Sequence, residues 1–426
     1  MLNSASLGVV GSAKFSRFFS RPCYDSYCFS NLPATISFLL SGKERSALPL
    51  DVFGDLPTRY DKVIFLFIDS FGWKFFERYA DRSSFLKTVL EWGVVSKLTS
   101  QFPSTTAAHA TCIHTGLEVG ESGVYEWQYY EPLVDEIIAP LLFSYAGDKT
   151  ARDTLKQTKL PPAAFYPRRT FYQALQEQGV AAHIFQYQAY TPSTFSDIVF
   201  RGASVHPYKN AQEAFTHLLE LVANRTTVPT YYFLYFDRID AMCHLYGPES
   251  KQADESIVAL LTVLDQHFCS GSQREVGGGK TLLMMSADHG HMSVDPQTTF
   301  YLNRQITGIE RYFRTNARNN PLVPAGSPRD MFLHLKEECM DEAIDVLRRH
   351  LPGRAEVHRT ADLLEQGFFG LRKPSTVFLQ RVGNVVLLPY QHETVWWYEE
   401  GRFDMHWAIT VDSPPRKWRS LLLLQI

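Results

Sequence analysis

Aspartate, histidine and threonine side chains suited to metal and phosphoryl chemistry recur in four short segments of the chain. Each segment follows an apolar run or a turn, and the four are Asp69, Thr105-Thr106, Asp240 with His244, and Asp288-His289-Gly290-His291. Carboxylates and imidazoles are ligands that zinc takes in catalytic sites, and a hydroxyl beside such an ion can serve as a nucleophile. The set therefore predicts a two-metal site for phosphoryl transfer.

Asp69 directly follows the apolar run 63–68. A carboxylate at the end of a buried strand must reach water, cap the next helix or bind a cation. Taken alone, the position favours a helix cap, because capping is the commoner role. The two Asp/His segments further along the chain reverse that preference.

Thr105 and Thr106 lie at the predicted start of a helix that Gly116 ends, shortly after Pro103. One interpretation is a simple Ser/Thr cap. The other places a hydroxyl where helix-start amides and a metal lower its pKa, so that it can attack a phosphorus atom.

Asp240 and His244 are four positions apart, so on a helical turn they share one face and can bind one ion. Such a pair is usually a surface pair, but this one follows the apolar run 231–236 and therefore reaches the same sheet edge as Asp69. Asp237 is a competing ligand whose spacing from His244 suits a shared helical face less well.

The segment Asp288-His289-Gly290-His291 follows another apolar run and is the most specific local signal in the chain. Two adjacent ligand types stand at a predicted strand end, and the glycine permits a tight turn. For His291 two roles remain open, as a metal ligand or as a donor that orients a ligand.

The elements that must position these residues alternate between strands and helices. We predict strands at 62–68, 231–236 and 281–285, and helices at 73–79, 211–223 and 256–268. The alternation predicts an α/β fold with a mostly parallel central sheet and helices on both faces. Ligands of such sheets bind beyond the carboxyl ends of the strands, where the acidic residues fall.

The predicted organisation has four parts. They are an N-terminal wrapping segment (1–60), a metal-binding core (61–299), a small α+β insert (300–400) and a C-terminal return to the core (401–426). Within the insert we predict strands at 330–335 and 385–388 and a helix at 341–349.

The amino-acid composition restricts the classes of molecule that are expected to bind this protein. The 426 residues carry a formal net charge of −3, which argues against a nucleic-acid polymer as partner. The six cysteines show no CxxC repeat, so a zinc ribbon or a thioredoxin-like site is not expected. The N-terminus lacks a basic start with a long apolar region, and every apolar run is too short to cross a membrane. These features predict a cytoplasmic protein without a membrane partner.

In their order along the chain, the four segments resemble the alkaline phosphatase superfamily and, within it, the type I phosphodiesterase/nucleotide pyrophosphatase family. The resemblance runs from about residue 61 to residue 296 and continues more weakly to the end. It is carried by Phe67-Ile68-Asp69, residues 102–106 through Thr115-Gly116, residues 240–248, and Ala287-Asp288-His289-Gly290. It implies an alkaline phosphatase-like fold and a hydrolase with two zinc ions, which manganese can replace. It also implies a covalent phospho-enzyme and a small-molecule phosphoester, such as a nucleotide, as substrate.

The resemblance assigns roles to particular residues. Thr106 is the implied nucleophile and a metal ligand, with Thr105 as the alternative. The first metal would be held by Asp69, Asp288 and His289. The second would be held by Asp240, His244 and a late histidine, His406 or else His392.

Two positions depart from the family pattern. His109 stands where nucleotide pyrophosphatases have an asparagine that steadies a phosphate oxygen, and an imidazole can donate a similar hydrogen bond. His406 is followed by Trp407, where the family usually has glycine. Two alternatives to a phosphodiesterase therefore stay open: a phosphomonoesterase or phosphomutase on the same metal core, and a non-catalytic binding protein.

An aromatic cluster follows the Thr106 helix and has two interpretations. Its members are Tyr125, Trp127, Tyr129 and Tyr130. They could stack on a planar leaving group, or they could form an aromatic part of the core.

Overall fold

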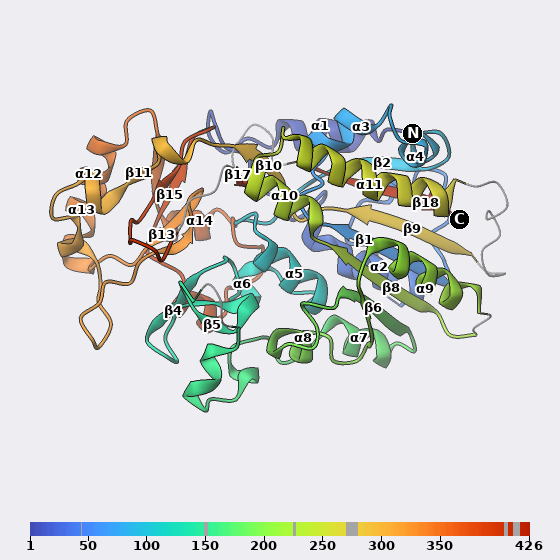
Figure 1. Ribbon diagram of the computed structural model, residues 1–426, viewed down its shortest axis with the longest axis horizontal. Coiled ribbons are helices and arrows are strands. Elements are labelled where there is room, and N and C mark those ends of the chain that lie inside the picture. The colour runs from blue at the N-terminus through green and yellow to red at the C-terminus, as the bar shows by residue number, and fades with distance from the viewer. Residues whose placement is uncertain (44, 149–151, 225–226, 270–279, 404–407, 412–417) are drawn as a thin grey trace.

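A seven-stranded sheet forms the centre of the computed structural model, which describes residues 1–426 except 44, 149–151, 225–226, 270–279, 404–407 and 412–417 (Figure 1). In their order across the sheet, the strands are β2 (Val94–Thr99), β18 (Trp418–Gln425), β9 (Thr281–Ser286), β1 (Lys62–Ile68), β8 (Thr230–Phe236), β6 (Ala181–Tyr187) and β7 (Ser204–Tyr208). Strand β18 runs antiparallel to both of its neighbours, whereas the pairs made by β1, β6, β7, β8 and β9 among themselves are parallel. The predicted mostly parallel sheet is confirmed.

Strand β1 lies in the middle of the sheet, and all seven of its residues are buried. Its side chains alternate between two apolar cores, with Phe65 and Phe67 on one face and Ile64 and Leu66 on the other. A strand covered on both faces needs apolar side chains at every position. This is why the run 63–68 shows no alternation of polar and apolar residues.

Helices cover both faces of this sheet. One face packs against α3 (Trp73–Tyr79), α4 (Ser84–Trp92), α9 (Ala211–Ala223) and α11 (Lys251–Phe268). The other packs against α2 (Leu32–Ser41), α5 (Thr106–Thr115) and α7 (Phe171–Glu177). In Figure 1, α11 lies level with the upper strands of the sheet, and α7 lies below β6. The predicted α/β class with helices on both faces is confirmed.

A smaller antiparallel sheet lies to the left of the main sheet in Figure 1. Its strands, in spatial order, are β12 (Ala325–Ser327), β13 (Asp330–Leu333), β15 (Val385–Pro389) and β14 (Ala355–Arg359). Helix α13 (Met340–His350) packs on it around an apolar cluster that includes Leu333, Leu347 and Leu387. We propose that residues 300–400 form one small module, as the sequence predicts.

The remaining elements connect these layers. The helices are α1 (Ser4–Ser12), α6 (Val119–Ser122), α8 (Thr194–Val199), α10 (Arg238–Tyr246), α12 (Leu302–Gln305), α14 (Thr360–Glu365) and α15 (Thr376–Arg381). The strands are β3 (Tyr129–Glu131), β4 (Glu136–Ala139), β5 (Ser144–Tyr145), β10 (Gly290–Ser293), β11 (Phe300–Tyr301), β16 (Val395–Trp396) and β17 (Ala408–Val411). The N-terminal segment lies along β2, where Asn3 donates its backbone N–H to Val95.

The element predictions were closest for long apolar or periodic runs. The bounds of β1, α3 and α9 match the predicted ones, whereas α11 begins at Lys251, five residues before the predicted start. The C-terminal run 421–424 was not predicted as a strand, yet it belongs to β18 and lies inside the main sheet between β9 and β2. An apolar run at a chain end carries no sign of its strand partners.

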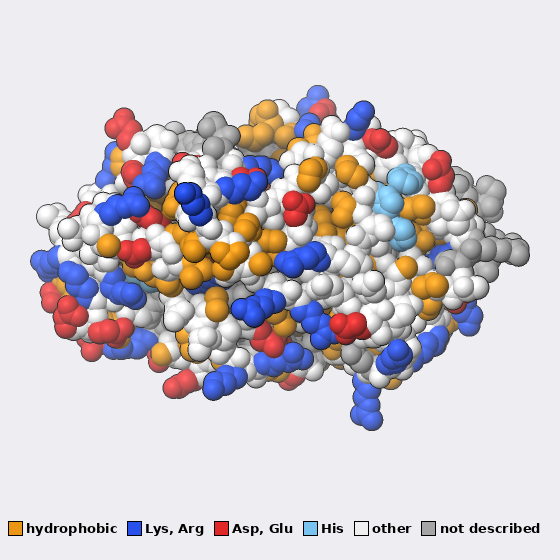
Figure 2. All heavy atoms as spheres, turned by 90° about the horizontal axis from the view of Figure 1, so that it is seen from below, with side chains coloured by type: hydrophobic (Ala, Val, Ile, Leu, Met, Phe, Trp, Pro, Cys, Tyr) orange, Lys and Arg blue, Asp and Glu red, His pale blue; other side chains and the backbone are white. Residues whose placement is uncertain are grey.

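The face shown in Figure 2 has basic and acidic side chains interspersed around a band of apolar ones. All six cysteines are free thiols. Among the helices that the structure describes, none has the length and apolar character needed to cross a bilayer.

A buried ion pair ties α15 of the small module to β3. The side chains of Arg381 and Glu131 are 2% and 3% exposed, and their Nη2 and Oε2 atoms lie 2.5 Å apart. Arg381 also donates to the carbonyl oxygens of Gly123 and Phe165. Removing one member of such a pair leaves the other charge buried without compensation.

We therefore expect Arg381→Leu to lower the free energy of unfolding by about 3–5 kcal/mol, measured by urea denaturation. Arg169→Leu is the matched control, because Arg169 pairs with Glu177 on the surface and both side chains are more than 60% exposed. The control should change stability by about 1 kcal/mol or less. Equal effects of the two substitutions would contradict a role for the buried pair.

Candidate active site

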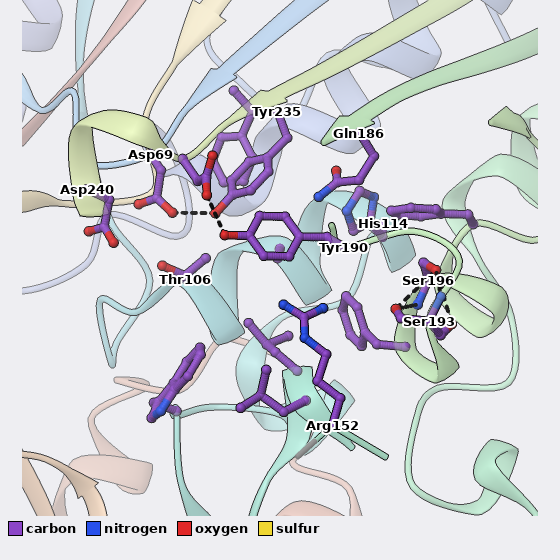
Figure 3. A pocket seen from close by; sticks show the side chains of 18 of the residues that line it. Asp69, Thr106, His114, Arg152, Gln186, Tyr190, Ser193, Ser196, Tyr235 and Asp240 are labelled. Carbon is purple, nitrogen blue, oxygen red and sulfur yellow. Dashed lines mark hydrogen bonds between the residues drawn. The ribbon is translucent and has the colours of Figure 1, made fainter. Parts of the chain in front are cut away.

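The predicted ligand residues meet at the carboxyl edge of three adjacent strands. Asp69 follows β1, Asp288 follows β9 and α10 follows β8. Helix α5 begins opposite this edge with Thr106. Figure 3 shows the side chains of Asp69, Thr106 and Asp240 around one space. Parallel neighbours end at the same level, so residues far apart in sequence become neighbours in space.

A glycine contact lets two of the ligand-bearing turns approach each other. A Cβ atom placed on Gly72, just after β1, would lie 3.0 Å from the Cα atom of Gly290 and 3.3 Å from the carbonyl oxygen of His289. A side chain at position 72 would therefore push the Asp288-His289 turn away from Asp69. The short distance between these turns depends on the absence of that side chain.

Asp69 and Asp288 are buried carboxylates with incomplete hydrogen bonding. Asp69 is 2% exposed, and its Oδ2 accepts a hydrogen bond from the Tyr235 hydroxyl. Asp288 is fully buried, and its Oδ1 accepts from the backbone N–H groups of Ser70 and His289. Asp69 Oδ1 and Asp288 Oδ2 are buried and accept no hydrogen bond from the described part of the chain. Buried oxygens of this kind need a partner, and a cation is one that fits carboxylates.

Burial raises the pKa of the Asp69 carboxyl well above its ordinary value, and the nearby charges of Asp240 and Asp288 raise it further. Three carboxylates held this close repel one another when all are ionised. A divalent cation would relieve the repulsion and keep all three ionised.

The imidazole of His289 stands at the centre of the cluster. Its Nε2 lies 3.0 Å from Thr106 Oγ1, 3.2 Å from Asp69 Oδ1 and 3.4 Å from Asp288 Oδ2. Its Nδ1 lies 3.1 Å from the carbonyl oxygen of Gly290. Donation from Nδ1 to this carbonyl leaves the Nε2 lone pair facing the cluster, which is the tautomer of a metal-binding histidine.

The two adjacent threonines make different contacts and therefore have different roles. Thr105 is the N-cap of α5, since its Oγ1 accepts from the Ala108 N–H at 3.3 Å and donates to the Tyr125 carbonyl at 3.0 Å. Thr106 is the first helical residue, and its hydroxyl faces His289 at 3.0 Å. Of the two interpretations of this segment, the cap therefore falls to Thr105, and the hydroxyl that faces the cluster belongs to Thr106.

Asp240 links the two halves of the cluster. Its Oδ2 lies 3.4 Å from His244 Nε2, and its Oδ1 lies 2.6 Å from His291 Nε2 and 3.8 Å from His289 Nε2. Burial by itself would raise the pKa of Asp240, but the neighbouring imidazoles lower it below its ordinary value, His244 most strongly. Burial also lowers the pKa of His291 to about 4, which keeps this ring neutral.

Two overlapping groups of the described residues have their ligand atoms close enough together to hold an ion. One is Asp69, Asp240 and His289, and the other is Asp240, His244 and His291. In each group the ligand atoms lie within 4.8 Å of one another. His291, whose role the sequence left open, thus lies beside Asp240 and His244, and its ring is nearly perpendicular to that of His244 at 4.6 Å.

His109 lies away from this cluster, contrary to the role that the sequence assigns to it. Its ring is fully buried and packs edge-on against Phe29. Its Nδ1 lies 2.8 Å from the Thr105 carbonyl oxygen, and its Nε2 accepts the backbone N–H of Gln101 at 3.1 Å. Both ring nitrogens are thus engaged by the backbone, so the imidazole has none to offer a phosphate oxygen. In sequence, a histidine on an apolar helix gives no sign of which way it faces.

The remaining candidate ligands from the sequence are the two late histidines, His406 and His392, and Asp237. His406 lies outside the described residues. The other candidate, His392, is exposed and hydrogen-bonds through Nδ1 to the Ser293 carbonyl and through Nε2 to Gln391. Asp237 accepts a hydrogen bond from Tyr190, and burial raises its pKa. Neither His392 nor Asp237 belongs to the two ligand groups.

The aromatic cluster divides between core and cavity. Tyr125 and Tyr129 are fully buried and stacked at 5.2 Å, and Tyr125 donates to the carbonyl of Arg381. They are core residues. Trp127 is 43% exposed and lines the cavity beside Thr106.

A cavity of about 280 Å³ opens beside Thr106. Its lining includes residues that the sequence did not single out, among them Tyr235, Tyr190, Arg152, Gln186 and Phe200. Most stand on β6 and β8 or on the loops that follow β5 and β6, so only pairing of the strands brings them to Thr106. Tyr235 is the one with a signal in the sequence, since it precedes the end of a predicted strand.

A mostly parallel sheet with Asp, His and Thr side chains gathered at its carboxyl edge places the protein among alkaline phosphatase-like α/β proteins. The sequence profile of the family described as type I phosphodiesterase / nucleotide pyrophosphatase matches residues 63–402. The chain belongs to this family. The family and the fold together support a hydrolase of the phosphodiesterase or pyrophosphatase type.

Solved structures with a similar fold share little sequence with this chain. Murine ectonucleotide pyrophosphatase/phosphodiesterase 5 matches with a TM-score of 0.61 and 15% identity, covering 85% of this chain and 88% of that one. An inactive threonine-to-alanine variant of the murine protein in complex with AMP matches with a TM-score of 0.60 and 14% identity, covering 85% and 87%. Phosphonoacetate hydrolase from Sinorhizobium meliloti, in complex with phosphonoformate, matches with a TM-score of 0.58 and 15% identity, covering 84% and 89%. A search of curated protein sequences finds no match.

Tyr235 orients Asp69 through its hydroxyl, so Tyr235→Phe should weaken metal binding. Loss of a hydrogen bond to a ligand typically costs about 10–100-fold in metal affinity, and we expect a loss in that range for zinc titrated into the metal-free protein by calorimetry. Tyr232→Phe is the control, because Tyr232 lies on the same strand and its hydroxyl contacts the Leu221 carbonyl at 3.4 Å. Equal zinc affinity in both variants would refute the orienting role of Tyr235.

Proposed function

We propose that the protein is a metal-dependent hydrolase that cleaves phosphodiester or pyrophosphate bonds through a phospho-threonine on Thr106, at a site for two zinc ions. The observation that carries the proposal is the 3.0 Å contact between Thr106 Oγ1 and His289 Nε2, inside a cluster with two groups of metal-ligand residues. A helix-start hydroxyl that faces a buried imidazole and carboxylates has the surroundings of an activated nucleophile.

The residues present fit divalent ions. The donor atoms are carboxylate oxygens and imidazole nitrogens, which suit zinc and also accept manganese. Asp69 Oδ1 and Asp288 Oδ2 are buried without hydrogen-bond partners in the described chain, as expected for oxygens reserved for a cation. We assign Asp69, Asp288, His289 and Thr106 to the first ion. We assign Asp240 and His244 to the second, with His291 or His406 completing it.

When bound, the ions would neutralise the phosphate charge and lower the pKa of the attacking hydroxyl. The bond-forming step itself uses a side chain of the protein. Thr106 Oγ attacks phosphorus in line and forms a P–O bond, while the bond to the leaving oxygen breaks and that oxygen takes up a proton. Water then attacks the phospho-threonine, which restores the Thr106 hydroxyl and releases a phosphate monoester or, from a monoester substrate, inorganic phosphate.

Positioning dominates this reaction, because phosphoryl transfer requires little covalent chemistry beyond the nucleophile. The cap formed by Thr105 holds the first turn of α5 in place. The Tyr235 hydroxyl holds Asp69, and the Gly290 carbonyl holds the His289 ring. A murine structural neighbour is inactive when one of its threonines is replaced by alanine, and this variant is in complex with AMP. Both facts favour an essential threonine and a nucleotide-like substrate in the proposed reaction.

Thr106→Ala tests the nucleophile. We expect kcat for bis(4-nitrophenyl) phosphate to fall by at least about 10³-fold with two zinc ions still bound, because the attacking atom is lost. Thr105→Ala is the control and should lose less activity, since it removes only a cap. Acid quenching during turnover followed by mass spectrometry should find a 4-nitrophenyl phosphoryl group on Thr106, because one aryl group leaves in the first step and the other stays on phosphorus. Full activity of Thr106→Ala would overturn the assignment, and faster cleavage of 4-nitrophenyl phosphate than of the diester would favour a monoesterase.

His291→Ala tests the second ion. We expect zinc bound per chain, measured by mass spectrometry after dialysis, to fall from about two to about one, because Asp240 loses a partner at 2.6 Å. His392→Ala is the control and should keep both ions. His406→Ala, measured in parallel, decides which imidazole completes the site. Two ions in His291→Ala at wild-type affinity would exclude His291 from either role.

A further inference from the structure

Three histidines that the proposed chemistry does not use lie together on the sheet face that packs against α9. They are His183 on β6, His206 on the edge strand β7 and His217 on α9. We propose that these edge histidines form a further metal site, which binds a divalent zinc, nickel or copper ion and ties the edge strand to β6 and α9. None of the three belongs to the candidate metal groups around Asp240, so the site does not depend on the proposed function.

The pairing of β6 with β7 places His183 and His206 on the same face of the sheet. In this parallel register Phe185 lies opposite His206, and His183 stands two residues before Phe185 on the same strand. Alternate residues of a strand point to the same side. On that side Phe185 shares an apolar core with Leu218 of α9, so the helix brings the neighbouring His217 to the same place.

The rings of the edge histidines have the spacing of imidazoles that share one ion. His183 Nδ1 lies 2.9 Å from His206 Nε2, and their ring centres are 5.2 Å apart. The centres of the His206 and His217 rings are 4.8 Å apart. Two imidazoles on one tetrahedral ion, with bonds of about 2.0–2.1 Å, have ring centres roughly 5 Å apart and nitrogens roughly 3.3 Å apart. Binding would therefore separate the first two nitrogens by a few tenths of an ångström and turn a nitrogen of His217 toward them.

The same ring arrangement occurs in one of the candidate metal groups. The rings of His244 and His291 are 4.6 Å apart at an angle of 87°. Those of His206 and His217 are 4.8 Å apart at an angle of 90°. Two separate places in the fold thus present imidazoles to each other in one geometry, and in the first of them a carboxylate already joins the rings.

Aromatic side chains hold the edge histidines in place. The His183 ring stacks on Tyr232 with centres 5.2 Å apart, and the His206 ring stacks on Phe185 with centres 4.9 Å apart. The His217 ring meets Phe185 edge-on at 5.4 Å. Rings that are already packed lose little conformational freedom when they bind an ion, so these contacts prepare the site.

The two facing histidines are kept in the neutral form, which is the form that binds metals. Burial lowers the pKa of His206 to about 4, and the nearby rings of His183 and His217 contribute to this shift. Burial also lowers the pKa of His183. A proton therefore competes little with an ion at neutral pH. Without an ion, one of the two facing nitrogens donates its proton to the other, and to bind an ion that ring takes its other tautomer.

The chemistry and the position of the site define the ion and its effect. Imidazole nitrogens suit zinc, nickel and copper, whereas magnesium and calcium prefer oxygen ligands. The three side chains are half-buried, so an ion can reach them from solvent. Figure 2 shows histidine side chains gathered at the surface, at the end of the molecule that holds β6 and α9 in Figure 1. An ion bound here would fasten an edge strand, which has a strand neighbour on one side, to two further elements.

Calorimetric titration of zinc into the protein without a polyhistidine tag, after zinc treatment and dialysis, tests the site. Half-buried imidazoles should bind more weakly than the buried cluster, so dialysis should empty the edge site. We expect about one further zinc per chain in wild type and none in His206→Phe, which keeps a ring on Phe185 but offers no nitrogen. His217→Ala should weaken this binding at least about 10-fold, since even the loss of a group that only orients a ligand costs that much.

His350→Ala is the matched control, because His350 is an exposed histidine on α13 whose Nδ1 lies 2.8 Å from the Val346 carbonyl oxygen. It should bind the further zinc as wild type does. Added zinc should also raise the thermal midpoint of wild type more than that of His206→Phe, because an ion that binds the folded state stabilises it.

Three results would overturn the site and leave the edge histidines as a stack of rings. They are no further zinc in wild type, equal binding in His206→Phe, and unchanged affinity in His217→Ala. None of these measurements depends on hydrolase activity or on zinc in the Thr106 cluster, so failure of the proposed function would leave the result readable.

Discussion

The arrangement of this protein depends on buried carboxylates that are held close together at one edge of a sheet. Asp69, Asp240 and Asp288 converge on the His289 ring, and two of their oxygens are buried with no hydrogen-bond partner in the described chain. Such a cluster is unfavourable unless a cation compensates it. The fold must therefore supply the energy that keeps these groups together before an ion arrives.

That energy comes from the sheet and from the layers on both of its faces. Strand β1 is buried at every position, and its neighbours β8 and β9 are aligned with it residue by residue. The alignment sets the relative heights of Asp69, Asp288 and helix α10. Gly72 and Gly290 then bring two of the turns within contact distance. The rigid strands therefore fix the geometry of the site, because each candidate ligand lies within a few residues of a strand end.

Residues of the same type have different roles around the cluster, and their hydrogen-bond partners decide which role each residue has. Thr105 caps the helix and Thr106 faces the cluster, although the two are adjacent. His289 and His291 face the cluster, whereas His109 and His114 are buried structural rings. Tyr235 orients a carboxylate, whereas Tyr125 supports the core. In each case the direction of the side chain and its hydrogen-bond partners decide its role, whereas the residue type alone does not.

The sequence by itself predicted the fold class, the family and most residues of the candidate metal-ligand groups, because continuous apolar runs followed by Asp or His can be recognised in a short stretch of sequence. It also predicted the bounds of β1, α3 and α9. Tertiary structure alone decided which way each side chain faces: it gave His109 to the core and placed His291 beside Asp240. It also inserted β18 into the sheet and brought Gln186 to the cavity beside Thr106. These outcomes depend on contacts between distant segments, and no short stretch of sequence contains the information about both partners.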